Sequence, residues 1–168
     1  MDIKSSLQIG KEVFISENSV IHPSIRGSKI KIGSFTQIYD FVCIKCVGGI
    51  GDITIGENCY LNPGTVIYSG NGVTIGNFVL IAPGCAIIPT NHEYKNKDEF
   101  IRNQGFRSSK GGVIIGNDVW LGANTVVLDG SVIGDGSIIA ANSVVNCEVP
   151  PYEIWGNEHG KIKKIKNR

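Results

Sequence analysis

The stretch IGNDVWLGANTVVLDGSVIGDGSIIAANSV, residues 115–144, divides into five consecutive units of six residues. Each unit begins with an aliphatic residue and carries Val, Thr or Ser at its fifth position, with the turn formers Gly, Asn and Asp between. No helix has this period, and the strands of an antiparallel sandwich recur about every 8 to 12 residues. The repeat therefore predicts short strands joined by corners, with one large and one small side chain per unit pointing inward.

The same period extends towards the N-terminus, with interruptions. Three units would close a triangular coil, and stacked coils would bury the aliphatic side chains while their backbones pair at about 4.8 Å. The sequence thus predicts an all-β protein, a parallel β-helix. The expected inward-facing first residues are Ile32, Ile38, Ile44, Ile55, Leu61, Ile67, Ile75, Ile81, Ile87, Ile115, Leu121, Val127, Ile133, Ile139 and Val145.

Breaks in the period indicate loops that leave the coil, and such loops often carry function. The largest break lies between Ile87 and Ile115, and two smaller breaks follow Ile44 and Ile67. We expect one β-helix domain over 1–168, with a projecting loop at 93–112 and a short helical tail at 151–168. The loop mixes charges with large apolar residues, which favours packing against a partner or substrate.

Composition narrows the functional classes. The formal net charge is +1, so charge balance suggests neither nucleic acid nor an anionic membrane as a partner. No apolar run is long enough for a signal peptide or a membrane span, and the five scattered cysteines suit a reducing compartment. Cys43 and Cys46 form a CxxC without a second pair, so we expect no metal site. The protein is expected to be cytoplasmic.

The hexads resemble those of the hexapeptide-repeat acyltransferases, whose β-helix is left-handed. The stretch YLNPGTVIYSGNGVTIGNFVLIAPGCAIIPTNH, residues 60–92, is similar without a gap to the sugar O-acetyltransferases of the galactoside and maltose acetyltransferase type. This resemblance implies acetyl-CoA as co-substrate, a homotrimer with sites between subunits, and a saccharide acceptor, as in saccharide or cell-surface polysaccharide modification.

The resemblance also assigns roles to residues. It makes His92 the catalytic base and Asn62 a contact of the acceptor. It places the oxyanion donor at the backbone N–H of Ala123, and lines the channel for the pantetheine arm of coenzyme A with Trp120, Gly122, Ala123 and Ala141. The chemistry requires such a base, because a sugar hydroxyl is weakly acidic and a histidine with a pKa of about 6.5 can accept its proton.

The sequence departs from the family pattern towards its C-terminal end. Ala140–Ser143 replaces a smaller Gly-Ala-Gly-Ser segment, which would narrow the pantetheine channel. Asn146 and Cys147 stand where a threonine and a lysine are usual, which puts a phosphate contact in doubt. The segment 156–161 replaces the usual G-x-P-A-[KR]. Lys161, Lys163 and Lys164 then either hold the adenine end of coenzyme A or form a solvated tail.

Three other functions fit the same fold. N-acetylation of a nucleotide-linked amino sugar places a lower demand on the base, because an amine is already nucleophilic once it has lost its proton. A γ-class carbonic anhydrase needs three zinc-binding histidines, two of them close in sequence, whereas His22, His92 and His159 are far apart. A non-catalytic scaffold would have no use for His92 and Asn62.

Overall fold

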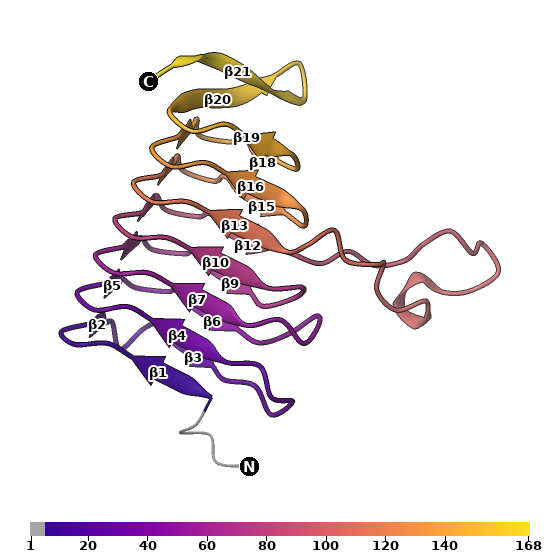
Figure 1. Ribbon diagram of the computed structural model, residues 1–168. Helices are drawn as coiled ribbons and strands as arrows, with labels where there is room; N and C mark the ends of the chain where they lie inside the picture. The colour runs from indigo at the N-terminus through magenta and orange to yellow at the C-terminus, as the bar shows by residue number, and fades with distance from the viewer. Residues whose placement is uncertain (1–5) are drawn as a thin grey trace.

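The computed structural model describes residues 6–168 and shows three parallel sheets that form the faces of a triangular β-helix (Figure 1). Sheet A consists of β1 (Leu7–Ile9), β4 (Ile30–Ile32), β7 (Ile53–Ile55), β10 (Val73–Ile75), β13 (Val113–Ile115), β16 (Ser131–Ile133) and β19 (Glu148–Val149). Sheet B consists of β2 (Phe14–Ile15), β5 (Gln37–Ile38), β8 (Tyr60–Leu61), β11 (Leu80–Ile81), β14 (Trp120–Leu121), β17 (Ile138–Ile139), β20 (Glu153–Glu158) and β21 (Lys161–Asn167). Sheet C consists of β3 (Val20–His22), β6 (Cys43–Lys45), β9 (Val66–Tyr68), β12 (Ala86–Ile88), β15 (Val126–Leu128) and β18 (Val144–Val145). The expected left-handed parallel β-helix is confirmed.

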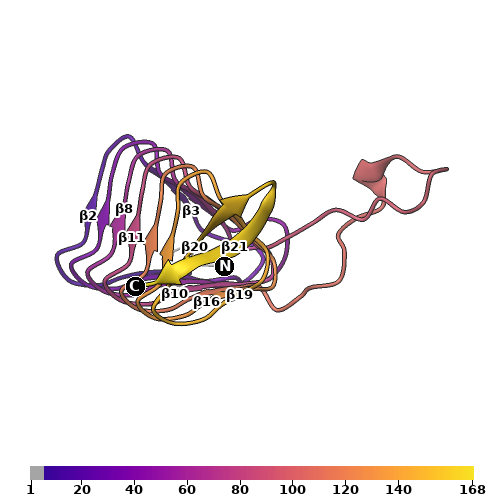
Figure 2. The ribbon, with the colours of Figure 1, turned by 90° about the horizontal axis from the view of Figure 1, so that it is seen from above.

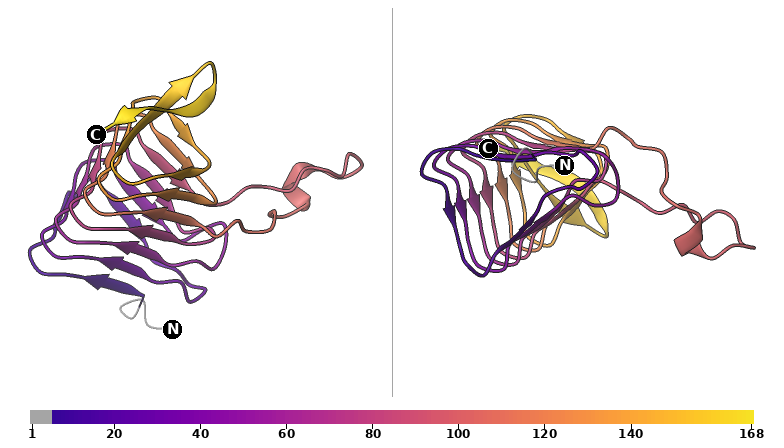
Figure 3. Two further views of the ribbon diagram at one scale, coloured as in Figure 1. Left: turned by 45° about the horizontal axis from the view of Figure 1, so that its top comes forward. Right: turned by 90° about the horizontal axis from the view of Figure 1, so that it is seen from below.

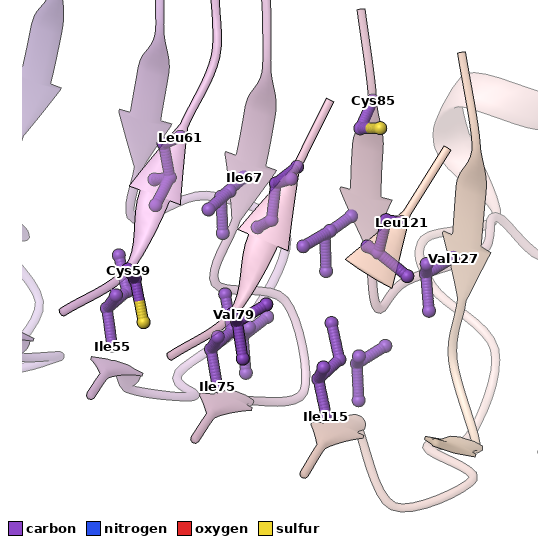
Figure 4. Packing of buried hydrophobic residues seen from close by; sticks show 14 of the residues in the cluster. Ile55, Cys59, Leu61, Ile67, Ile75, Val79, Cys85, Ile115, Leu121 and Val127 are labelled. Atoms are coloured by element: carbon purple, nitrogen blue, oxygen red, sulfur yellow. The ribbon is translucent and has the colours of Figure 1, made fainter. Parts of the chain in front are cut away.

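The interior is filled by the aliphatic residues that the repeat predicts to point inward. Each of the fifteen predicted first residues is at most 3% exposed, and they stack in register from coil to coil (Figure 4). The fifth positions are also buried, for example Cys59, Val79 and Thr125. Because a fully buried aliphatic side chain contributes about 1.5–3 kcal/mol, this column is the main source of stability.

The corners explain which residue types occupy the fourth position of the hexad. The backbone at this position is left-handed in successive coils, with φ of 57° at Asn124 and 58° at Asn142. Gly, Asn and Asp adopt this conformation most readily. Phe35 and Phe78 nevertheless occupy the same corner position with φ of 62° and 58°, so their side chains are tolerated on the rim of the helix.

Every break in the period lies on the same edge of the triangle. We call the edge where the chain passes from sheet B to sheet C edge BC, and the next one, from sheet C to sheet A, edge CA. The three breaks and the turn after β3 all follow strands of sheet C, so their loops leave together from edge CA. The long loop after β12 extends far beyond the body of the helix (Figures 2 and 3). It contains one 3₁₀ turn, η2 (Ile101–Asn103).

The prediction of a helical C-terminal tail is wrong. Residues 153–167 form a hairpin in which β20 pairs in parallel with β17, and β21 pairs antiparallel with β20 (Figure 1). The last coil leaves unpaired backbone groups on the edge of sheet B, and β20 satisfies them where a helix would not. The lysine-rich β21 then forms the new edge, a composition that discourages further strand pairing. Within residues 6–168, the structure contains no helix long and apolar enough to cross a bilayer.

Candidate functional site

His92 lies on edge CA, where the long loop leaves the helix. The two limbs of the loop form a short antiparallel ribbon, in which His92 is bridged to Phe106. The Arg107 N–H donates to the Asn91 carbonyl at 2.8 Å, and the Glu93 N–H donates to the Gly105 carbonyl at 3.1 Å. The imidazole is exposed and packs on the Phe106 ring, with 4.8 Å between ring centroids. The root of the loop therefore holds His92 in a defined place while leaving it open to solvent.

A hydrogen bond fixes which nitrogen of His92 carries the proton. Nδ1 lies 3.2 Å from the carbonyl oxygen of Gly105. A carbonyl oxygen can only accept, so in the neutral ring Nδ1 is protonated and Nε2 keeps its lone pair. A neutral imidazole held in this tautomer is suited to accept a proton at Nε2.

The neighbouring carboxylate does not orient the imidazole. Glu93 accepts the N–H groups of Tyr94 at 2.9 Å and Lys95 at 3.2 Å through one oxygen. The hydrogen bond from Tyr94 is the main cause that lowers the pKa of Glu93. The group that orients His92 is instead the backbone of Gly105, which no side-chain pattern in the sequence could identify.

Four of the other predicted site residues lie together on edge BC. β8, β11, β14 and β17 are in register, so the corners that follow them stack directly. Asn62 stands two coils below Gly122, and Ala141 lies one coil above Ala123. The Asn62 side chain donates from Nδ2 to the Ile81 carbonyl at 2.8 Å, which leaves its Oδ1 as an acceptor. Asn62 thus has a structural role in its corner as well as a polar atom available to a ligand.

The backbone N–H of Ala123 has no acceptor among residues 6–168. The same corner position is occupied by Pro63 and Pro83 in the two coils below, and proline has no N–H to donate. Stacking of the coils therefore requires no backbone N–H donor at this corner position. In the coil of β14, the free N–H of Ala123 can serve a ligand.

Gly122 has a structural reason to be glycine. A Cβ at this position would lie 2.5 Å from the backbone N of Ala141 and 2.8 Å from the Ile139 carbonyl oxygen. The close approach of the next coil thus accounts for this residue without a cofactor. Ala140, which stands where the family usually has glycine, lies close to the C-terminal hairpin. Its Cβ is 3.0 Å from the position that a Cβ on Gly156 would occupy.

Trp120 points outward from sheet B. Its side chain is 49% exposed and stands in a row of apolar residues on the outer face of sheet B, which are Tyr60, Leu80, Trp120 and Ile138. With Leu80 and Ile138 it lines a hollow that extends to Phe78, Asp118 and Arg168 at the edge between sheets A and B. Lower in the same region, the rings of Tyr39 and Tyr60 stack with a centroid distance of 6.3 Å and an interplanar angle of 6°. The hollow beside Trp120 is therefore apolar, but none of Asn62, Gly122, Ala123 and Ala141 lines it.

The predicted site residues fall into two groups that a single chain keeps apart. His92 lies on edge CA, whereas Asn62, Gly122, Ala123 and Ala141 lie on edge BC, and Trp120 lies on the outer face of sheet B. The two edges are separated by the width of sheet C, a hexad spanning at most about 20 Å at the usual rise per residue. Within one chain, the two groups therefore lie on different edges of the triangle.

The remaining candidates have local partners. Lys163 and Lys164 pair with Glu158 and Glu153 on the neighbouring strand, so the hairpin itself uses two of the three lysines.

Burial raises the pKa of the Cys59 and Cys85 thiols, which disfavours them as nucleophiles. Residues 6–168 contain no cluster of three His, Cys, Asp or Glu side chains fit for a metal ion.

Comparisons with family models, known proteins and solved structures all indicate the same family. Residues 112–147 match the model of the bacterial transferase hexapeptide family, described as six repeats. A probable acetyltransferase of Mycobacterium tuberculosis is 30% identical over 156 residues, which cover 93% of this chain and 50% of that protein. The galactoside O-acetyltransferase of Escherichia coli is 39% identical over 100 residues, covering 60% of this chain and 47% of that protein. The chain thus spans about half the length of these relatives.

Solved structures extend the match over nearly the whole chain. A variant of an N-acyltransferase from Bacillus cereus, in complex with dTDP-4-amino-4,6-dideoxyglucose and coenzyme A, is 26% identical with a TM-score of 0.81. The match covers 98% of this chain and 86% of that one. The matching family model, the relatives and the fifteen buried hexad positions agree, and the chain belongs to the hexapeptide-repeat transferase family.

Proposed function

We propose that the protein is an acetyl-CoA-dependent O-acetyltransferase that transfers an acetyl group to a sugar hydroxyl. The observation that carries this proposal is the bond from His92 Nδ1 to the Gly105 carbonyl, which leaves Nε2 ready to accept a proton. The similarity to a galactoside O-acetyltransferase supports the same reaction. The five free cysteines fit a cytoplasmic location, where acetyl-CoA is available.

The reaction follows from these positions. His92 Nε2 accepts the proton of the acceptor hydroxyl as the oxygen attacks the thioester carbon and a C–O bond forms. The tetrahedral oxyanion accepts the N–H of Ala123. Collapse of this intermediate breaks the C–S bond, and the proton on Nε2 passes to the departing thiolate of coenzyme A. The protein supplies proton transfer and a hydrogen bond, and no covalent enzyme intermediate is needed.

The second candidate is N-acylation of a nucleotide-linked amino sugar. The observation that favours it is the likeness to the Bacillus cereus N-acyltransferase, which covers nearly the whole chain. The two functions differ in the acceptor atom and in how much they depend on His92. The structure of edge BC suits both, because Asn62 Oδ1 can accept from a hydroxyl or from an amine.

One experiment separates these functions. Release of coenzyme A from acetyl-CoA is measured across neutral sugars and nucleotide-linked amino sugars, and the product is identified as an ester or an amide by its stability to mild alkali. We expect ester formation on a sugar. Amide formation on a nucleotide-linked amino sugar supports the second candidate, and the absence of turnover on every acceptor contradicts both.

The separation of the two groups also supports a homotrimer with sites between copies. In a closed ring, edge CA of one copy meets edge BC of the next, and sheet C, which lies between these edges, faces the threefold axis. The outward residues of sheet C are suited to such burial, since they include Val66, Ala86, Val126, Ile88 and Leu128. The projecting loop, with Phe100 79% exposed and Tyr94 57% exposed, would then cover the neighbour.

Val126→Asp is expected to prevent trimer formation, because it would place a charge among apolar side chains at the axis. The outward-facing Val126 lies between Ala86 and Val144 in the ladder of sheet C, so the fold itself should survive. The matched control is Val132→Asp on the outer face of sheet A. Sedimentation should give a monomer for the first variant and a trimer for the control and the wild type. A wild-type monomer at micromolar concentration would contradict the assembly.

Asn62→Ala is expected to act mainly on the acceptor. Loss of one neutral hydrogen bond, worth about 1 kcal/mol, should raise the KM for the acceptor roughly fivefold while the KM for acetyl-CoA stays unchanged. Steady-state kinetics with each substrate varied in turn measures this split. An equal rise in both KM values would show that Asn62 only supports its corner.

A further inference from the structure

Asp129 is a buried carboxylate at the foot of the long loop. It directly follows β15 on edge CA, one coil above the strand that leads to His92, and it is 4% exposed. Its Oδ2 accepts the Lys110 N–H at 2.8 Å and Asn71 Nδ2 at 3.1 Å, and its Oδ1 accepts the Gly112 N–H at 2.9 Å. One side chain therefore fastens the returning limb of the loop to the helix.

The segment held by Asp129 is tightly packed against the backbone. Gly112 has φ of +81°, and a Cβ there would lie 2.5 Å from the Gly72 carbonyl oxygen. Gly130 has φ of +86°, and its N–H donates to the Gly112 carbonyl at 2.6 Å. Residues 110–112 are thus clamped between the coils above and below, and Asp129 supplies the side-chain part of the clamp.

Among the described residues, the charge of Asp129 has no cationic partner. Within residues 6–168, no Lys, Arg or His nitrogen lies within 4.0 Å of its oxygens, although Lys95, Arg107 and Lys110 line the same hollow. The carboxylate is satisfied by three N–H donors alone, an arrangement that an amide cannot reproduce. An asparagine would direct its own NH₂ at one of these donors and lose at least one bond.

A short path connects this clamp to the imidazole. Lys110 is three residues from Arg107, whose N–H binds the Asn91 carbonyl, and the Gly105 carbonyl accepts from both His92 and Glu93. We propose that Asp129 is a positioning residue, which holds the returning limb so that the Gly105 carbonyl keeps His92 in its Nδ1–H tautomer. This inference rests on the proposed role of His92 as the general base.

The test compares Asp129→Ala and Asp129→Asn with a control, Asp135→Ala. Asp135 also accepts a backbone N–H, that of Asn117 at 2.7 Å, but it lies on the edge between sheets A and B, away from the loop. Because small displacements of a catalytic group can cost up to about 10²-fold, Asp129→Ala should lower kcat about ten- to hundredfold with little change in the KM for acetyl-CoA. Asp129→Asn should show a smaller loss, and Asp135→Ala should keep the wild-type kcat.

A second readout does not depend on turnover. Nitrogen NMR of labelled histidine should show Nδ1–H for His92 in the wild type and the control, and a mixture of tautomers in Asp129→Ala. A wild-type tautomer in both folded Asp129 variants would overturn the inference, as would an unchanged kcat. If the wild type has no activity but the tautomer still responds to Asp129, the positioning holds and the proposed function fails. Should Asp129→Ala not fold, the Asn variant carries the same comparison.

Discussion

Replacement of His92 by alanine is expected to lower kcat by about two to four orders of magnitude, the usual contribution of a general base. The reason is that the acceptor hydroxyl then has no group to take its proton as the C–O bond forms. The KM for acetyl-CoA should change little, because the proposed cofactor surface lies on edge BC. Single-turnover and steady-state measurements of coenzyme A release, with an acceptor that the wild type uses, give both values.

The matched control for this prediction is His22→Ala. His22 is also an exposed histidine beside edge CA, at the end of β3, but it is not part of the loop ribbon. This variant should keep the wild-type rate. If His92→Ala retained most of its activity on a hydroxyl acceptor, general-base catalysis by His92 would be wrong. The same result with an amine acceptor would instead favour the N-acyltransferase function.

The hexad determines the interior, which is why the sequence could predict so much of the fold. Residues six positions apart occupy equivalent inward-facing positions on successive faces of the triangle, so Ile115, Leu121 and Val127 were identified as core without knowledge of their partners. Corners were less predictable. Asn124 fits its left-handed backbone by type, whereas Phe35 and Phe78 occupy the same backbone conformation without a sequence signal.

The tail shows the limit of local pattern. Lys161–Asn167 alternates only loosely, and its conformation depends on the open edge of sheet B that the last coil presents. That edge exists only once the coils have stacked, so no local sequence pattern indicates it. The same holds at the loop root, where the Gly105 carbonyl binds the His92 ring and the Asp129 carboxylate binds the Lys110 N–H. Each contact joins a side chain to a distant backbone atom, which carries no residue-specific pattern.

The division of the site between two edges also follows from the stacking. In sequence, His92 lies between Asn62 and Trp120, which gives the impression of one continuous site. In the β-helix, position within the triangle matters more than order along the chain, so residues one hexad apart stand on different edges. The two edges are formed by different corners of the coil, and in the proposed trimer His92 of one copy would meet Ala123 of the next.

Ala123→Pro is the substitution that tests the oxyanion donor directly. Proline removes the N–H, and its ring is already accommodated at Pro63 and Pro83 in the same position of the stack. The variant should therefore fold and trimerise normally but lose about 10²- to 10³-fold in kcat. The control Ala123→Ser adds a polar atom while keeping the N–H, and it should remain within a fewfold of the wild type. Normal turnover by a folded Ala123→Pro would exclude this N–H as the donor.

The same variant tests whether the site is shared. Chains carrying Ala123→Pro and chains carrying His92→Ala are co-expressed in equal amounts and purified as mixed trimers. A site with edge CA from an Ala123→Pro chain and edge BC from a His92→Ala chain is intact, so about a quarter of the sites should recover full activity in a random mixture. A site built within one chain would recover none, because each chain carries one defect. Activity of the mixture well above both parent variants would therefore place His92 and Ala123 of different copies on one reacting carbon.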